Sequence, residues 1–216
     1  MTGCSCCQGV DEVFGERKAR HDLERYRRRG PSKPTRRLLE ALRREGIERA
    51  SVLDIGGGVG AIQHELLENG AERAISVEAS AAYLRATKDE AARRGYGDRM
   101  TYEAGDFVAI ADRVEPADVV TLDRVICCYP DMEALVGHSA ERARRVYGLV
   151  YPRDRWWVGF GIGFTNLLMR LTRRAYRAYV HPTSAVDAVA RAHGLVPTVA
   201  QRAGPVWQVA VYVREA

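Results

Sequence analysis

One short segment, Asp54–Gly60 (DIGGGVG), combines an acidic side chain with closely spaced glycines. An apolar stretch precedes it and a helix-like stretch follows it, which is the context of a nucleotide-binding loop. Glycines in such a loop permit a tight turn and let a ligand approach the backbone closely. The first chemistry that the sequence predicts is therefore the binding of a nucleotide-like ligand.

Two classes of ligand fit the glycine spacing. Gly56, Gly58 and Ala61 match the G-x-G-x-x-G/A fingerprint of dinucleotide binding. Gly56, Gly58 and Gly60 also match G-x-G-x-G, with an acid two residues before the first glycine. Asp54 would repel a pyrophosphate but would attract a cation. S-adenosylmethionine carries an ammonium and a sulfonium and no phosphate, so the acid favours it over NAD.

Cysteine thiols are the second group with chemical potential. Cys127 and Cys128 are adjacent in RVICCYPD, and the remaining cysteines are Cys4, Cys6 and Cys7. All five could gather a soft metal if the N-terminus folded over the middle of the chain, although C-x-C-C is not the usual zinc spacing. Adjacent cysteines form strained disulfides, which argues against a redox pair. Since neighbours in an extended segment point opposite ways, we expect Cys127 in the core and Cys128 at a functional site.

Alternating strands and helices must position these residues. From about residue 50 onward the alternation predicts a parallel α/β sheet with helices on both faces. The last two strands are joined so closely that they must pair antiparallel. We expect strands at 50–56, 73–79, 100–106, 117–123, 146–152, 194–204 and 205–215, and helices at 10–30, 33–45, 61–70, 80–95, 132–145 and 182–193.

Several motifs in this order resemble those of the class I S-adenosylmethionine-dependent methyltransferases. DIGGGVG resembles their glycine motif, SVEAS their acidic strand end, Gly105-Asp106-Phe107 their G-D motif, and ADVVTLDRV their fourth motif. The resemblance covers about residues 51–216. It implies a Rossmann-like sheet of seven strands with an antiparallel C-terminal hairpin. It also implies a cofactor-binding domain at 49–216 behind an N-terminal helical cap at 1–48.

The resemblance further implies roles for individual residues. Glu78 would hold the ribose hydroxyls, Asp106 would face the adenine amine, and Asp123 and the residues after it would face the transferred methyl group. The predicted cofactor-binding residues are Asp54, Gly56, Gly57, Gly58, Gly60, Glu78, Ala79, Gly105, Asp106, Phe107, Asp123 and Arg124.

The sequence gives fewer indications of the site that would bind the methyl acceptor. Cys128-Tyr129-Pro130 and the segment 177–181 resemble the magnesium-protoporphyrin O-methyltransferases, but that family carries His, a proposed acid/base, where this chain has Cys128. Our candidates for catalysis are Cys128, Tyr129, His181 and Tyr26. The apolar segment 156–164 is interpreted either as a core-packing helix start or as an acceptor lid or membrane-facing flap.

Composition and charge limit the classes of protein to which the chain could belong. With 216 residues and 46% hydrophobic content, the chain is long enough for one globular domain. The net charge of +5 is compatible with an anionic or hydrophobic small-molecule acceptor or with peripheral membrane contact, whereas no RNA-recognition signature appears. The opening MTGCSCCQG lacks the regions of a signal peptide, so we expect a cytoplasmic protein.

The predicted function is S-adenosylmethionine-dependent methyl transfer to a small molecule, with O-methylation favoured. The alternatives are an NAD-dependent oxidoreductase and a non-catalytic, metal-responsive cofactor-binding protein.

Overall fold

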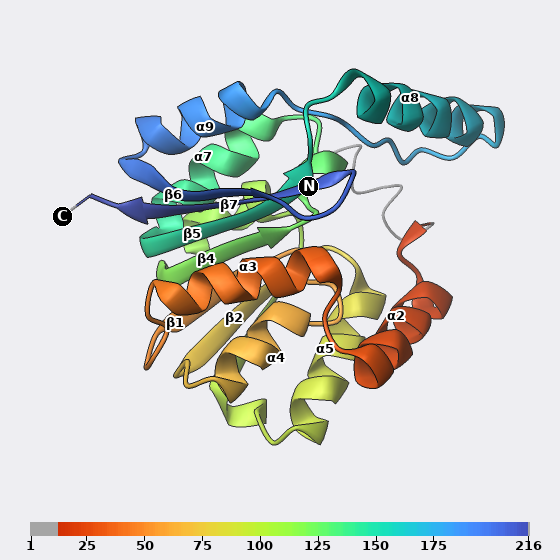
Figure 1. The fold of residues 1–216 in the computed structure, drawn as a ribbon. Coiled ribbons are helices and arrows are strands. Elements are labelled where there is room, and N and C mark those ends of the chain that lie inside the picture. The colour runs from red at the N-terminus through yellow and green to blue at the C-terminus, as the bar shows by residue number, and fades with distance from the viewer. Residues whose placement is uncertain (1–12, 216) are drawn as a thin grey trace.

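The computed structural model describes residues 13–215. Its centre is a seven-stranded sheet in the order β3-β2-β1-β4-β5-β7-β6 (Figure 1). β1 to β5 run parallel, and β7 pairs antiparallel with both β5 and β6. The strands are β1 (Ser51–Ile55), β2 (Arg73–Glu78), β3 (Met100–Ala104), β4 (Ala117–Asp123), β5 (Ala143–Pro152), β6 (Leu195–Arg202) and β7 (Trp207–Arg214).

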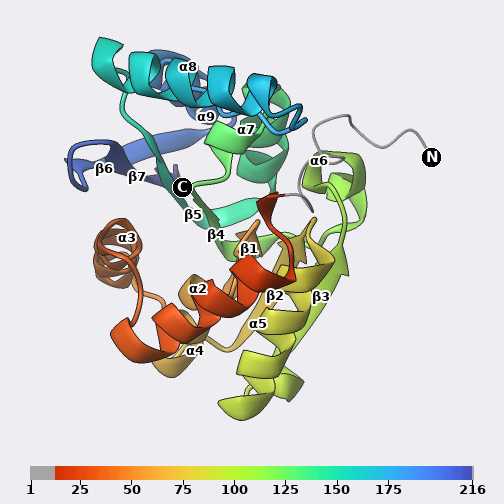
Figure 2. The same cartoon turned by 90° about the vertical axis from the view of Figure 1, so that its right-hand side faces the viewer.

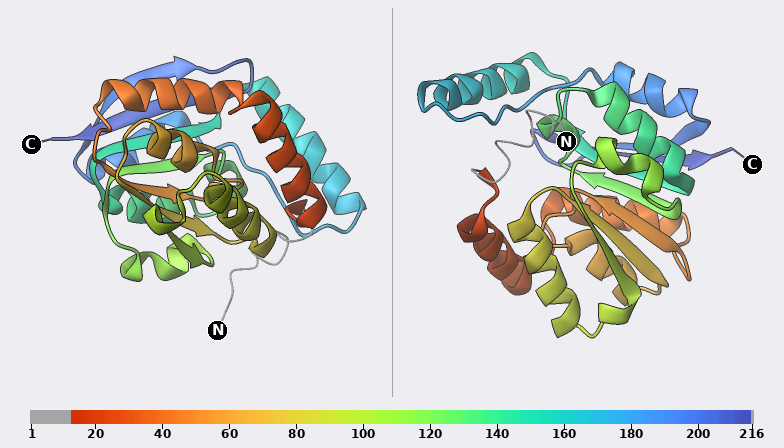
Figure 3. Two further views of the ribbon diagram at one scale, coloured as in Figure 1. Left: turned by 90° about the horizontal axis from the view of Figure 1, so that it is seen from below. Right: turned by 180° about the vertical axis from the view of Figure 1, so that it is seen from behind.

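Helices cover both faces of this sheet, as the alternating pattern predicts (Figures 1 and 3). Every strand that the sequence predicts is present, with bounds that differ by a few residues. The helices are α2 (Glu16–Arg29), α3 (Lys33–Arg44), α4 (Ala61–Glu68), α5 (Ala81–Arg93), α6 (Phe107–Ile110), α7 (Met132–Arg142), α8 (Trp156–Leu171) and α9 (Thr183–Ala192).

Alternation along β1 divides the core into two layers. Val52 packs in a cluster with residues of α3 and α4, whereas Leu53 and Ile55 pack in a cluster with residues of α7 and α9. Successive side chains of a strand point to opposite faces, so one strand contributes to both clusters. The carboxyl ends of β1, β2 and β4 therefore lie between two firmly packed layers.

α3 is held against the sheet at a glycine. Leu38 and Leu42, which are fully buried, lie where a Cβ on Gly148 of β5 would approach them to 2.9 and 3.0 Å. Ser32 begins the helix, because its hydroxyl accepts a hydrogen bond from the Thr35 amide. The close fit fixes the start of α3 near the carboxyl end of β4.

α8 contradicts one of the two interpretations of residues 156–164, the core-packing helix start. It is a helix of 16 residues of which only Val158 is buried. Figures 1 and 3 show it reaching beyond the end of the sheet. Within residues 13–215, no helix has the length and apolar character needed to cross a membrane.

Candidate cofactor-binding site

A cavity of about 370 Å³ opens at the carboxyl ends of β1, β2 and β4. Figure 2 looks onto this end of the sheet, with α2 in front of α5 and α8 above. Most of the residues predicted from the sequence line this one cavity. They are Tyr26, Gly56, Gly57, Gly58, Glu78, Ala79, Gly105, Asp106, Phe107, Asp123, Arg124, Cys128 and Tyr129.

Gly56, Gly57 and Gly58 of the glycine loop form the floor of the cavity, whereas Gly60, also predicted from the sequence, does not line it. Gly56, Gly58 and Gly60 have φ values of 63°, 60° and 78°, in the left-handed region that favours glycine. Gly57 has a different constraint, because a Cβ there would stand 2.2 Å from Oδ2 of Asp54. The loop is therefore closed to larger side chains for both conformational and steric reasons.

Asp54 lies fully buried beneath this loop, outside the cavity wall. Thr121 donates a hydrogen bond of 2.7 Å to Oδ1, while Oδ2 has no partner among the described residues. Burial raises the pKa of Asp54 to about 7, with the Thr121 hydrogen bond opposing the rise and the charges of Asp123 and Glu78 adding to it. The ligand-free site thus holds a carboxyl group that a nearby cation would stabilise in its charged form.

Glu78 ends β2 with its carboxylate turned back to the loop. Oε2 accepts a hydrogen bond from the Gly58 amide at 3.0 Å, and Oε1 accepts one from the Ser80 amide at 2.9 Å. Burial raises the pKa of Glu78, and these backbone hydrogen bonds oppose the rise. A carboxylate has about four acceptor positions, so Glu78 keeps capacity for hydroxyl groups of a ligand.

Asp106 occupies the next position along the cavity. Its Oδ1 accepts from the Val108 amide at 3.2 Å, which caps α6, and its Oδ2 accepts from the Tyr129 hydroxyl at 3.0 Å. Phe107 is buried beside it, and both residues line the cavity. The G-D motif and the residue after the cysteines, 23 positions apart, therefore meet in one wall.

Asp123 and Arg124 form an ion pair at the end of β4. Arg124 Nε donates to Asp123 Oδ1 at 2.9 Å, and Thr35 Oγ1 donates to Oδ2 at 2.6 Å. Arg124 has a φ of 62°, which is uncommon for a residue with a side chain. Thr35 was not among the predicted residues, since the sequence has no signal for a contact across 88 positions.

The expectation that Cys127 and Cys128 point opposite ways is wrong. Residues Ile126–Cys128 form a turn of 3₁₀ helix rather than an extended segment. The two Sγ atoms consequently lie 3.8 Å apart, and both thiols contact the Arg124 carbonyl. The expected burial of Cys127 is confirmed, and Cys128 lines the cavity.

Cys128 lies in an environment that favours its thiolate. Hydrogen bonds from Cys127 and from the Tyr176 hydroxyl, 3.0 Å away, lower the pKa of Cys128 against the opposing effect of burial. The hydrogen bond with Cys128 and burial raise the pKa of Cys127. Tyr176 comes from the segment after α8, and the sequence alone did not identify it.

Two other catalytic candidates have structural partners. His181 is absent from the cavity wall, and its Nε2 lies 3.2 Å from the Ile126 carbonyl and 3.0 Å from the Tyr129 carbonyl. It therefore braces the turn that carries the cysteines. Tyr26 lines the cavity, but its hydroxyl donates to Glu65 Oε1 at 3.0 Å.

The metal-site hypothesis involves five cysteines, of which the structure describes Cys127 and Cys128. Residues 13–215 contain no group of three or more His, Cys, Asp or Glu side chains arranged to hold a metal ion. Cys4, Cys6 and Cys7 lie outside the described residues.

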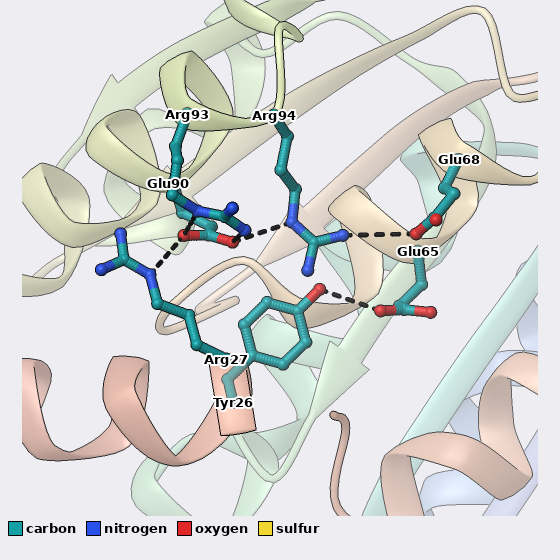
Figure 4. Close-up of polar contacts among 7 residues, drawn as sticks. All are labelled: Tyr26, Arg27, Glu65, Glu68, Glu90, Arg93 and Arg94. Atoms are coloured by element: carbon teal, nitrogen blue, oxygen red, sulfur yellow. Dashed lines mark hydrogen bonds and ion pairs between the residues drawn. The ribbon is translucent and has the colours of Figure 1, made fainter. Parts of the chain in front are cut away.

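An ionic cluster fastens α2 over the cavity. Figure 4 shows Arg27 of α2 converging with Arg93 and Arg94 on the fully buried carboxylate of Glu90 in α5. Burial alone would raise the pKa of Glu90, but the hydrogen bonds from the three arginines hold it below its usual range. The Arg94 guanidinium also lies 5.0 Å from the centre of the Tyr26 ring. Arg93 and Arg94 follow Glu90 at helical spacing, but the Arg27 contact crosses 63 positions and has no sequence signal.

Comparison with known proteins finds similarity to methyltransferases. Residues 52–146 match a family model described as a methyltransferase domain. No curated protein sequence matches the chain significantly.

Solved structures with the same fold include methyltransferases. Magnesium protoporphyrin IX methyltransferase from Synechocystis PCC 6803 with bound SAM is 17% identical, with a TM-score of 0.72 over 100% of both chains. An O-methyltransferase family protein from Burkholderia thailandensis is 16% identical, with a TM-score of 0.70 over 96% of this chain and 63% of that one. An O-methyltransferase family 2 protein from Planctomyces limnophilus DSM 3776, in complex with apigenin, is 15% identical, with a TM-score of 0.68 over 98% and 65%. At these identities the likeness establishes the fold.

The raised pKa of Asp54 predicts a dependence of stability on pH. The folded, ligand-free protein keeps the Asp54 proton up to about pH 7, whereas an unfolded aspartate loses it near pH 4. The folded state then binds more protons over that range, so the contribution of Asp54 to the free energy of unfolding falls as pH rises from about 4 to about 7. Asp54→Asn should raise the free energy of unfolding at pH 7.5 by roughly 1–4 kcal/mol.

Urea unfolding of the ligand-free protein at pH 5 and pH 7.5 measures this effect. Asp98→Asn, at an exposed position, is the matched control and should keep the wild-type dependence on pH. An Asp54→Asn variant with the same pH dependence as wild type would contradict the assignment.

The ionic cluster predicts local opening of α2 when Glu90 loses its charge. Glu90→Gln should speed amide hydrogen exchange in α2 by at least about tenfold, because the link to Arg27 weakens. Glu40→Gln, an exposed change on α3, serves as the control. Equal protection of α2 in both variants would show that the cluster does not hold the helix.

Proposed function

Because this chain carries a class I S-adenosylmethionine-dependent methyltransferase domain, we propose that it transfers the methyl group to a small-molecule acceptor, with oxygen as the favoured methylated atom. The observation that carries this proposal is the composition of the cavity wall. The glycine loop, the Glu78 carboxylate and the Asp106 carboxylate all line one cavity at the carboxyl ends of the strands. Open α/β sheets bind ligands at that edge.

Each part of the wall has a role in this proposal. The backbone of Gly56–Gly60, with Asp54 beneath it, would hold the methionine end of the cofactor, whose ammonium would favour the charged form of Asp54. Glu78 and Ala79 contact the ribose, with Glu78 accepting from the hydroxyls. Asp106 accepts from the adenine amine, and Gly105 and Phe107 flank the ring. Asp123 and Arg124 lie at the methyl-transfer end.

The N-terminal helices complete the site. We propose that residues 1–48 act as a helical cap on the cofactor-binding domain of residues 49–216. The support lies in α2, whose Tyr26 lines the cavity and whose Arg27 binds Glu90. Thr35, at the start of α3, adds a hydrogen bond to Asp123.

Cys128 is the proposed proton acceptor. When bound, the cofactor supplies a methyl group on a sulfonium that is already electrophilic. A carboxylate acceptor needs no base, whereas a phenol or hydroxyl gains from one. The Cys128 thiolate, favoured by Cys127 and Tyr176, would take the hydroxyl proton onto Sγ as the acceptor oxygen bonds to the methyl carbon. The bond from that carbon to the sulfonium sulfur would break at the same time and leave a neutral thioether. Tyr129 then positions Asp106 through its hydroxyl, and His181 holds the cysteine turn in place.

Calorimetry with S-adenosylmethionine and with NAD tests the choice of cofactor. We expect binding of S-adenosylmethionine and none of NAD. Glu78→Ala and Asp54→Ala should each weaken binding by at least about tenfold, or about 1.4 kcal/mol. Glu115→Ala, an exposed carboxylate just before β4, is the control and should bind normally. Binding of NAD alone, or unchanged affinity in both site variants, would refute the assignment.

The reactivity of Cys128 tests its role without knowledge of the acceptor. Alkylation by iodoacetamide, followed residue by residue with peptide mass spectrometry, should show a midpoint pH for Cys128 below the value of about 8.5 for a free thiol. Tyr176→Phe should raise that midpoint, because the thiolate loses a hydrogen bond, whereas Tyr179→Phe should not. A midpoint pH for Cys128 at or above 8.5 that does not change in Tyr176→Phe would contradict its proposed role as proton acceptor.

A further inference from the structure

α8 presents a large apolar surface to solvent. Trp156, Phe160 and Leu171 are 84%, 75% and 71% exposed, which is extreme for residues of this type. The exposed large hydrophobic residues within the described chain all lie on this helix: Trp156, Trp157, Phe160, Phe164, Leu167, Leu168 and Leu171.

These side chains share one side of the helix. At about 100° of rotation per residue, all seven fall within an arc of about 120°. The opposite arc holds Val158, Ile162, Asn166 and Met169, which are buried or half-buried. The apolar arc therefore points away from the rest of the protein.

The rotation of α8 about its axis is fixed by hydrogen bonds. Asn166 Nδ2 donates to the Ala178 carbonyl at 2.7 Å, and the Ala178 amide donates to Asn166 Oδ1 at 2.9 Å. These two bonds tie the inward face of the helix to the segment that follows it. Rotating α8 so that the apolar arc faced inward would break both hydrogen bonds. The fold therefore keeps these apolar side chains exposed.

The helix also lacks features that would stabilise it alone. Gly159, Gly161 and Gly163 have no atom within 4 Å of an added Cβ, so close packing does not require glycine there. Each costs about 1 kcal/mol of helix stability relative to alanine. A surface that covers the apolar arc would offset this cost.

The charges around the arc indicate which kind of surface covers it. From Arg155 to Val186 the sequence has no acidic residue and five arginines. Arg155 precedes the helix, and Arg170, Arg173 and Arg174 gather at its other end, all of them exposed. Arginine places its apolar stem beside hydrocarbon and its guanidinium among phosphates. Each such residue adds about 1 kcal/mol of attraction to an anionic membrane surface.

We propose that the apolar face of α8 with its arginine rim docks on the surface of an anionic lipid bilayer. The helix of 16 residues is about 24 Å long, shorter than the roughly 30 Å hydrocarbon core. It therefore lies in the plane of the interface, with its aromatic and leucine side chains in the acyl boundary and its arginines at the headgroups. The segment that follows α8 carries Tyr176, which contacts Cys128 at 3.0 Å, so this docking surface is directly connected to the wall of the cavity.

Vesicle co-sedimentation of the full chain tests the proposal. We expect binding to vesicles that contain 30% phosphatidylglycerol in phosphatidylcholine, and weaker binding to pure phosphatidylcholine or at high salt. Tryptophan emission should shift to the blue on binding, because Trp156 leaves water. Phe160→Ser combined with Phe164→Ser should weaken binding by at least about tenfold. Both positions are exposed, so the melting temperature should hold.

Charge-matched variants separate docking from general attraction. Arg170→Gln with Arg174→Gln should weaken binding to the anionic vesicles by at least about fivefold. Arg43→Gln with Arg44→Gln, the same charge change at the far end of α3, should not. Equal effects of the two pairs, or no binding to anionic vesicles, would overturn the proposal. Sedimentation velocity gives a further outcome that would overturn it. If the wild-type chain were a dimer and the Phe160→Ser, Phe164→Ser variant a monomer, a second copy of the chain would cover the apolar face instead of a membrane.

Discussion

The carboxylate of Asp54 lies beneath Gly57, at a position where any Cβ would meet it at 2.2 Å. This close approach of the carboxylate to the Gly57 backbone links the charge at the site to the shape of its floor. Because the carboxylate is buried with one oxygen lacking a partner among the described residues, its charge is costly until a cation approaches. Because position 57 must be glycine, no side chain covers the loop there, and its backbone remains accessible to a ligand. Glu78, which accepts from the Gly58 amide, fixes the other side of the same loop.

Segments far apart in the chain close the site around this floor. Arg27 reaches Glu90, Thr35 reaches Asp123, and Tyr176 reaches Cys128. Each contact joins a peripheral segment to one that lines or borders the cavity, so the N-terminal helices and the segment after α8 are structural parts of the wall. The same arrangement leaves α8 with one face tied to the protein and the other exposed. The cavity and the exposed face of α8 therefore both result from how these segments are arranged at the carboxyl edge of the sheet.

The sequence predicts the sheet and the floor of the site well, because both are encoded by local patterns. The run VLDIGGGVG shows a strand, a turn and a helix start within nine residues, and Ser80 caps α5 as expected. Prediction fails where a contact is long-range or a backbone conformation is unusual. The 3₁₀ turn at Ile126–Cys128 brings two thiols together that an extended segment would separate. The apolar residues 156–164 have the same composition whether they pack inside or face outward, and only the tertiary structure distinguishes the two.

We propose that one cavity holds S-adenosylmethionine with its groups in a fixed order along the wall. A crystal structure of the complex with S-adenosylhomocysteine tests it most directly. The account predicts ribose hydroxyls on the Glu78 carboxylate, the adenine amine on Asp106, and the sulfur directed toward the side of the cavity formed by Cys128. A complex in which the ribose lies away from Glu78, or in which the ligand occupies another part of the protein, would contradict it.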